Sequence, residues 1–282
     1  ISLGLVGSEM CIRDRLAVEE IAPTYLVVLR LFLASVLLGP IFIRMKDLAL
    51  MKEQIPAILL LGIINAALPF FLYAYSAQEL SAGMLSILNG TSPLFALIIA
   101  IIVFKQNTTI MQIFGLGLGF IGLLVFIGVD KLSFIFFPVL LCLIGAFCYA
   151  YSNNILFKLN HIRSSALASV TMISGFFFSL PLILVEPKAF SWDISPEIIF
   201  AIFFLGLVST GISFIAYVIL LQRSSPVQAS SIIFLVPVTG IFWGAIFLGE
   251  VISAKVLVGA FFILIGIALT NLFKPKVLSR DA

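Results

Sequence analysis

Long apolar blocks without charge alternate with short polar stretches along most of the chain. Eight such blocks cover residues 55–76, 82–103, 110–129, 134–157, 166–185, 198–221, 227–248 and 256–273. A ninth block, 25–43, holds one charge, Arg30. Each block can cross a hydrocarbon core of roughly 30 Å as a helix, and each exceeds the roughly 9–11 residues of a barrel strand. The pattern therefore predicts an all-α polytopic membrane protein, a helical bundle of about nine spans.

The composition agrees with a membrane protein and argues against several classes of function. Hydrophobic residues make up 62% of the chain, charged residues 10%, and the mean hydropathy is +1.26. The single histidine, His161, lies in a basic loop, and the spans hold no pair of carboxylates, which argues against an intramembrane enzyme. Cys11, Cys142 and Cys148 have no metal-ligand spacing and fit packing roles. We expect no metal, no cofactor, no ATP-driven pump and no nucleic-acid partner.

Lysine and arginine fall mainly on one side of the membrane if the loop 44–54 is cytoplasmic. That side then holds Arg44, Lys46, Lys52, Lys105, Lys158, Arg163, Arg223, Lys274, Lys276 and Arg280. The opposite side holds only Lys131, Lys188 and Lys255. Because cytoplasmic loops carry the excess of basic residues, we expect the tail 274–282 to lie in the cytoplasm, with the protein in the plasma (inner) membrane.

The chain also resembles itself. Residues 61–128 align without a gap with residues 205–272. Breakers and glycines coincide in the identical pairs Gly62/Gly206, Tyr73/Tyr217, Ser81/Ser225, Pro93/Pro237, Gly115/Gly259 and Gly122/Gly266. Five spans separate a helix from its equivalent, and this odd number means that equivalent helices cross the membrane in opposite directions. The sequence predicts an inverted-topology repeat, which many secondary transporters use.

The repeat requires a first span before residue 25 to match the block 134–157. At the same offset, residues 1–15 carry Glu9, Arg13, Asp14 and Arg15 instead. We expect residues 1–15 to be a non-native segment in place of a lost first helix; a genuine polar tail is the alternative. The predicted organisation is a segment 1–15, a first repeat 16–129 with an incomplete first helix, a second repeat 134–273 and a tail 274–282.

Polar residues and helix breakers occur together in the middle of the block 82–103. Pro93 removes the hydrogen bond to the carbonyl of Asn89, and Thr91 can bond freed backbone groups. Pro237 lies at the matched position of the second repeat. Paired helix breaks in two repeats predict a substrate site beside them. Kinks that only help the helices to pack are the alternative.

Other polar and aromatic residues at membrane depth extend this candidate solute site. Asn65, Ser213 and Tyr217 lie in matched spans, and Asn153 lies near the end of 134–157. For Tyr149 and Tyr151 we favour an interfacial belt. Trp243 fits either a cavity wall or a lipid-interface anchor. The paired glycines indicate close helix packing.

Two charged residues need separate explanations. Arg30 either faces a wet cavity, where it binds an anionic group or pairs with a carboxylate, or reaches the headgroups by snorkelling. Glu250 is a candidate coupling residue, but a hydrogen bond to the start of the next helix, which follows Ser253, fits the short connection better. The equivalent position of the first repeat is Gln106, so only the second repeat would carry a coupling carboxylate at this place.

Three stretches resemble the EamA-type drug/metabolite transporter superfamily. They are "APTYLVVLRLFLASVLLGPIFI", "LSAGMLSILNGTSPLFALIIAIIV" and "SSPVQASSIIFLVPVTGIFWGAIFLGEVIS" followed by "GAFFILIGIAL". The resemblance covers nearly all of the chain from Leu16. It implies a ten-helix, two-repeat permease or exporter of small metabolites such as amino acids, or of drug-like solutes. By this resemblance Arg30 is the arginine of the second helix, and Glu250 is the carboxylate of the "GE" pair.

The expected function is a secondary-type transporter that works by alternating access through a central cavity. The expected partners are a small-molecule solute and the lipid bilayer, with a homodimer as one form of assembly. A passive channel or facilitator is the first alternative, and a non-transporting membrane sensor or scaffold is the second. Neutral, zwitterionic and anionic solutes fit the candidate lining, which is dominated by asparagine and tyrosine.

Overall fold

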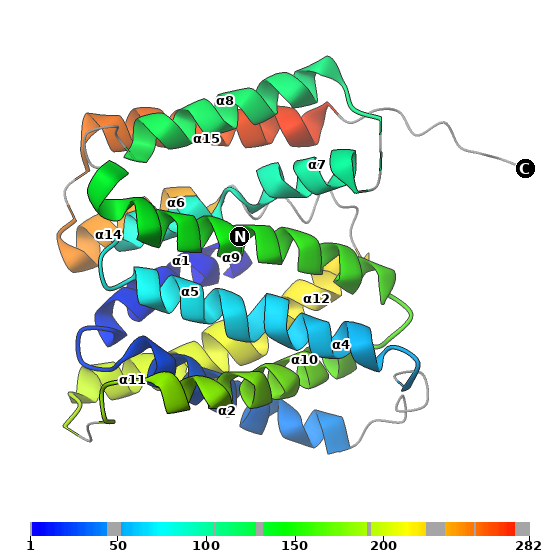
Figure 1. The fold of residues 1–282 in the computed structure, drawn as a ribbon, viewed down its shortest axis with the longest axis vertical. Coiled ribbons are helices and arrows are strands. Elements are labelled where there is room, and N and C mark those ends of the chain that lie inside the picture. The colour runs from blue at the N-terminus through cyan, green and yellow to red at the C-terminus, as the bar shows by residue number, and fades with distance from the viewer. Residues whose placement is uncertain are drawn as a thin grey trace, which may run out of the picture.

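A computed structural model describes residues 2–43, 52–103, 105, 107–127, 132–190, 193–223, 235–250 and 252–273. Within these ranges every regular element is a helix. Figure 1 shows the helices stacked side by side with their axes roughly aligned, and their connections gathered at two opposite ends of the bundle. This is the arrangement that a bilayer imposes, because a helix satisfies its own backbone hydrogen bonds.

The helices follow the predicted blocks closely. In chain order they are α1 (Ser2–Ala17), α2 (Pro23–Ile43), α4 (Ile55–Leu61), η1 (Gly62–Ala67), α5 (Leu68–Ser76), α6 (Ala82–Asn89), α7 (Ser92–Ile102), α8 (Ile110–Ile127), α9 (Leu132–Lys158), α10 (Ser164–Ser179), η3 (Leu180–Val185), α11 (Pro196–Phe204), η4 (Leu205–Ile212), α12 (Ser213–Arg223), α14 (Leu235–Leu248) and α15 (Ala254–Leu272).

The prediction of a polytopic all-α membrane protein is confirmed. Within the described residues, 7 helices are long and apolar enough to cross a membrane, and two shorter apolar helices, Val236–Leu248 and Ala254–Thr270, follow them. The first part of the predicted block 227–248 lies outside the described residues. The other predicted blocks each coincide with a helix, or with consecutive helices, to within a few residues.

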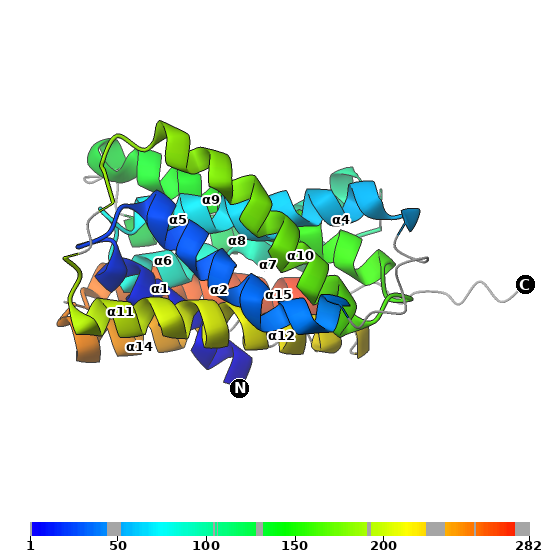
Figure 2. The same cartoon turned by 90° about the horizontal axis from the view of Figure 1, so that it is seen from below.

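The internal repeat is visible in which helices pack together. Two pairs of matched helices, α2 with α10 and α8 with α15, lie against each other, and the contact between α8 and α15 is the most extensive. In addition, α6 of the span 82–102 packs against α14 of the matched span. Figure 1 shows α8 and α15 side by side along most of their length, and Figure 2 shows α2 and α10 next to each other on the face nearest the viewer. This is the packing expected of two repeats related by a pseudo-twofold axis that passes between the matched helices.

Glycines hold α8 and α15 together. A Cβ atom at Gly122 would lie 2.7 Å from the backbone nitrogen of Ile263, and one at Gly266 would lie 2.6 Å from the carbonyl oxygen of Gly115. Gly115 and Gly259 make equally close backbone contacts across the same interface. These helices can therefore approach only because the side chains are absent, which confirms close packing as the role of these glycines.

Two stretches of π-helix occupy equivalent places in the two repeats. η1, Gly62–Ala67, interrupts the span that begins with α4, and η4, Leu205–Ile212, interrupts the span that begins with α11. In the first repeat Pro69 has no N–H for the carbonyl of Asn65, which favours a wider turn there. Such π-helical turns are frequent at functional sites. Because η1 and η4 lie at matched positions, their side chains are candidates for a shared functional site.

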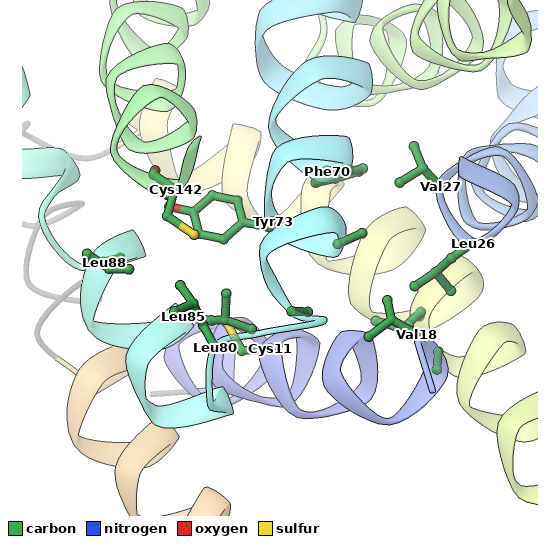
Figure 3. Close-up of a cluster of buried hydrophobic side chains, with 14 of the residues drawn as sticks. Cys11, Val18, Leu26, Val27, Phe70, Tyr73, Leu80, Leu85, Leu88 and Cys142 are labelled. Carbon is green, nitrogen blue, oxygen red and sulfur yellow. Dashed lines mark hydrogen bonds between the residues drawn. The ribbon is translucent and has the colours of Figure 1, made fainter. Parts of the chain in front are cut away.

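The apolar core lies where α1, α2, α5, α6 and α9 meet (Figure 3). Leu26 and Val27 of α2, Phe70 and Tyr73 of α5 and Leu85 of α6 belong to it. The Tyr73 hydroxyl donates a hydrogen bond to the carbonyl oxygen of Cys142 over 3.1 Å. The cysteines Cys11, Cys142 and Cys148 are free and buried, in agreement with packing roles.

The first residues form a helix that the sequence analysis did not expect. Ser2–Ala17 forms α1, which packs against α14 and α6. Its counterpart at the repeat offset, α9, also packs against α6. Its polar residues have partners: Arg13 lies near Glu9, Arg15 lies near Glu19, and Asp14 pairs with Arg30. Residues 2–17 are therefore helical although the sequence places four charged residues there. That residues 1–15 replace a different helix stays a prediction.

Candidate functional site

A cavity of about 170 Å³ lies between the two repeats. Five of the residues proposed from the sequence line it: Asn65, Asn89, Asn153, Ser213 and Tyr217. They come from four elements: Asn65 from η1, Asn89 from α6, Asn153 from α9, and Ser213 and Tyr217 from the first two turns of α12. Residues that are far apart in the chain thus meet at one place, as the pattern of polar residues predicts.

Several lining residues form pairs related by the repeat. Asn65 lies on η1 and Ser209 at the equivalent position of η4, and both line the cavity. Phe70 and Phe214 form a second such pair, and both also line it. Ser92 and Val236 form a third. The cavity is therefore placed on the pseudo-twofold axis, where matched elements of both repeats reach the same space.

The helix breaks also meet beside the cavity. Between α6 and α7 the chain passes through Gly90 and Thr91, and the Thr91 hydroxyl donates to the carbonyl oxygen of Leu88 over 2.6 Å. A Cβ atom at Gly90 would lie 2.5 Å from Cγ of Pro237. The break in the first repeat thus touches the proline of the second. Pro93 is buried in the first turn of α7, where proline is tolerated because an N–H there would have no intrahelical acceptor.

Two hydrogen bonds fix polar side chains of the lining. The Asn65 amide donates to the Ser152 hydroxyl over 2.5 Å, and the Tyr217 hydroxyl donates to Oδ1 of Asn153 over 2.8 Å. Each bond joins α9 to a span that carries a π-helical stretch. They involve the Nδ2 amide group of Asn65 and the Oδ1 atom of Asn153. Within the described residues, the Asn89 amide has no hydrogen-bond partner in the protein.

Arg30 is buried behind the cavity wall. Its side chain is 1% exposed, and Nη1 lies 3.1 Å from Oδ1 of Asp14. Nε donates to the Thr210 hydroxyl over 2.6 Å, and the guanidinium carbon lies 3.9 Å from the centre of the Phe70 ring. Thr210 and Phe70 both line the cavity. The snorkelling interpretation of Arg30 is therefore wrong, because its charge is paired inside the bundle and reaches the cavity only through its neighbours.

Tyr149 corrects the assignment of an interfacial belt. It lines the cavity and stacks on Tyr73 with ring centres 6.1 Å apart, whereas Tyr151 is exposed on the outer surface of the bundle. The two residues differ because positions two apart on a helix face different sides. A helical projection of α9 with Asn153 set on the cavity would have placed Tyr149 beside it, one turn away.

Besides Arg30, two predicted solute-binding residues, Thr91 and Trp243, do not line the cavity. Thr91 is fully buried and is committed to the backbone of α6. Trp243 is partly exposed and packs between Phe242 and Phe247, with ring centres 5.1 and 5.3 Å away. Conversely, Ser209, Phe70 and Phe214 line the cavity without having been proposed. Projecting Asn65 through the repeat offset would have identified Ser209, because it is the equivalent position.

Glu250 caps a helix, but not the one expected. Its Oε1 accepts a hydrogen bond from the N–H of Ala82 over 2.5 Å, and its Oε2 accepts from the N–H of Gly83 over 3.0 Å. These groups begin α6 of the first repeat, while Ser253 caps α15. A Cβ atom at Gly244 would lie 2.6 Å from Oε2, so this glycine makes room for the carboxylate. The contact ties the second repeat to the break-bearing span of the first, which spacing along the chain could not reveal.

We expect Glu250→Ala to lower the free energy of unfolding by about 2 kcal/mol, because two N–H groups at a helix start lose a charged acceptor. Glu250→Gln keeps one acceptor oxygen and should lose about half as much. Thermal unfolding in detergent measures both effects. Glu197→Ala is the matched control, because that carboxylate is exposed in the first turn of α11. Equal stability of Glu250→Ala and the unmodified chain would contradict the assigned cap.

Comparison with known proteins gives consistent matches. The sequence profile of the EamA-like transporter family matches residues 11–128 and again residues 136–272. The uncharacterized transporter YoaV of Bacillus subtilis (strain 168) is 26% identical over 274 residues, which cover 95% of this chain and 93% of the relative. A probable amino-acid metabolite efflux pump of Salmonella typhimurium is 26% identical over 80% of each chain.

A solved structure has the same fold. A chain titled "Crystal structure of protein" superposes with a TM-score of 0.67 over 98% of this chain and 99% of its own length. Its sequence identity is 15%, so the likeness concerns the arrangement of helices alone. The double profile match coincides with the two sets of helices that pack as matched pairs.

Proposed function

Because this chain belongs to the EamA-like transporter family, we propose that it is a secondary-type transporter that carries small solutes through the central cavity by alternating access. The protein is a multi-pass membrane transporter. The proposed solutes are small metabolites such as amino acids, or drug-like compounds, and the proposed mode is that of a permease or exporter. The name of the Salmonella relative, a probable amino-acid metabolite efflux pump, supports this choice of solutes.

The observation that carries the proposal is the cavity lined by repeat-related residues. Asn65 with Ser209 and Phe70 with Phe214 reach the same space from opposite sides of the pseudo-twofold axis. When two repeats exchange conformations about such an axis, a site on the axis is retained while access alternates between the two membrane faces. A site placed within one repeat would not have this property.

The proposed solute contacts are Asn65, Asn89, Asn153, Ser213 and Tyr217 of the lining. Arg30 acts on them through Thr210 and Phe70, its neighbours in the wall. The breaks at Pro93 and Pro237 supply the backbone positions at which the spans bend. Thr91 and Trp243 do not contact the solute in this proposal. Thr91 stabilises the helix break through its hydrogen bond to the carbonyl oxygen of Leu88. Glu250 is the candidate coupling group, because it joins the two repeats at one end of the bundle.

For orientation we propose that the bundle end holding Glu250 faces outward in a plasma (inner) membrane, with the C-terminal tail in the cytoplasm. The excess of lysine and arginine in the connections at the other end supports this. A reporter fused after residue 282 tests it: a fluorescent protein that matures only in the cytoplasm should be bright, and a periplasmic alkaline phosphatase fused there should be inactive.

The function is tested by solute flux in proteoliposomes, with amino acids and cationic drugs as the screened compounds. Saturable uptake of at least one compound, absent from protein-free vesicles, is expected. Uptake that rises linearly with concentration would favour a passive facilitator. No flux of any compound by a folded protein would remove the main support of the transporter assignment and favour a sensor or scaffold.

A further inference from the structure

One buried hydroxyl in the cavity wall lacks a partner. Ser209 is 3% exposed, and within the described part of the chain its Oγ has no hydrogen-bond partner. A hydroxyl on a buried helix ordinarily bonds a carbonyl one turn earlier, as Ser76 does to Leu72 and Thr171 does to Leu167. Ser35 and Ser86 also have unpartnered buried hydroxyls, but neither lines the cavity. Ser209 therefore combines an unused hydroxyl with a place on the lining.

The π-helical stretch η4 carries Ser209. It presents Ser209 and Thr210 on consecutive positions to the cavity, while the neighbouring Ser213 hydroxyl donates to the carbonyl oxygen of Val208 over 2.9 Å. A buried polar group without a partner costs about 1–3 kcal/mol, so such groups generally serve a bound ligand or water. The equivalent residue of the other repeat, Asn65, already bonds Ser152.

The groups around Ser209 select for hydrogen-bond acceptors. The Thr210 oxygen accepts from Nε of Arg30, so its own O–H is left to donate. Among the described residues that line the cavity none is a carboxylate, so a cationic group would have no counter-ion there. The Arg30 guanidinium beside Phe70 is paired with the Asp14 carboxylate, so that carboxylate is not free to act as a counter-ion for a cationic solute.

We propose that the Ser209 hydroxyl donates a hydrogen bond to the transported solute, and that the solute carries an acceptor oxygen at this wall and no net positive charge. Its apolar part packs between Phe70 and Phe214, the repeat-related rings of the lining. A donor group of the solute is accepted by Oδ1 of Asn65 on the opposite side. Neutral and zwitterionic compounds with a carboxylate or carbonyl oxygen fit this arrangement. The inference rests on the proposed transport function.

The test compares Ser209→Ala with the unmodified full chain in proteoliposomes, using leucine, phenylalanine and phenethylamine as probes. Phenethylamine is phenylalanine without the carboxylate. We expect the unmodified chain to carry at least one of the amino acids and not phenethylamine. Ser209→Ala should raise KM for that amino acid about fivefold, the effect of one lost hydrogen bond, with the maximal rate within about twofold. Its thermal unfolding midpoint should be unchanged or higher, because the lost hydroxyl has no hydrogen-bond partner among the described residues.

Ser169→Ala is the matched control. The Ser169 hydroxyl donates to the carbonyl oxygen of Leu38 over 2.8 Å, between α10 and α2 and away from the cavity. This variant should unfold at a lower temperature and keep its KM. If Ser209→Ala lowers stability and leaves KM unchanged, the hydroxyl is structural and the inference is wrong. If phenethylamine is carried and neither amino acid is, the inferred solute class is wrong although transport stands. If no probe moves, the proposed function fails first.

Discussion

Replacing Asp14 with asparagine is expected to lower the free energy of unfolding by about 3–5 kcal/mol, the effect of leaving one member of a buried ion pair without its partner. The Asp14 carboxylate faces Nη1 of Arg30 with both oxygens, at 3.1 and 3.3 Å. Arg30 is held in place by Thr210 and Phe70, so its charge cannot move to water. Thermal unfolding of the detergent-solubilised chain measures the loss.

The ion pair between Arg15 and Glu19 provides the control near the same helix. Its atoms lie 3.1 Å apart, but the Glu19 side chain is 59% exposed. Glu19→Gln should therefore change stability by less than about 1 kcal/mol. Asp14→Leu combined with Arg30→Met should recover much of the loss of Asp14→Asn, because apolar groups of similar size often replace a buried pair without loss. Equal stability of Asp14→Asn and Glu19→Gln would contradict the buried pair.

Adding one methyl group at Gly266 is expected to destabilise the bundle by about 1–3 kcal/mol. The new Cβ would lie 2.6 Å from the carbonyl oxygen of Gly115 and 2.6 Å from the nitrogen of Gly119. These are backbone atoms, which cannot rotate away, so α8 and α15 must separate. Gly122→Ala, at the equivalent position of the first repeat, should have an effect of similar size, since its Cβ meets the backbone of Ile263 at 2.7 Å.

Gly117 on α8 offers a control of opposite sign. A Cβ atom there would have no neighbour within 4 Å. Alanine is a better helix former than glycine by about 0.8–1.0 kcal/mol, so Gly117→Ala should raise stability. Thermal unfolding of the three variants side by side tests the interface. If Gly266→Ala and Gly117→Ala shifted the midpoint in the same direction, α8 and α15 would not be packed as the structure has them.

The fold could be predicted because its signals are local in the chain. The length of each apolar block fixes a helix such as Ile110–Ile127 whatever its neighbours are. The repeat offset then identifies matched helices, and Gly122 with Gly266 mark where they touch. The same reasoning brought Asn65, Asn153 and Tyr217 to one cavity, because matched and polar positions had to share a space inaccessible to lipid.

The remainder depended on tertiary contacts that no spacing encodes. Glu250 follows α14 in the chain and caps α6. It reaches α6 only because α14 packs against that helix. In the sequence the charged Asp14 argues against a membrane span. In the structure its charge is paired with Arg30, which makes its burial acceptable. In each case the deciding partner is distant in sequence.

The prediction that residues 1–15 stand in for another first helix has its own test. A chain that runs from Leu16 with a first helix typical of the family should fold and should transport the same solute at a higher maximal rate than the chain as given. A replacement helix must supply a new partner for Arg30, because Asp14 is lost with the segment. Equal transport by the two chains would show that α1 serves as the first helix.

The most direct test of alternating access is solute counterflow. Proteoliposomes loaded with an unlabelled amino acid are diluted into a trace of the same compound carrying a radioactive label. A carrier that exposes its cavity to one side at a time exchanges solutes, so the label should rise transiently above its equilibrium level inside the vesicles. Label that only approaches equilibrium from below, at a rate independent of the internal solute, would mean that the cavity opens to both sides at once and would contradict the account.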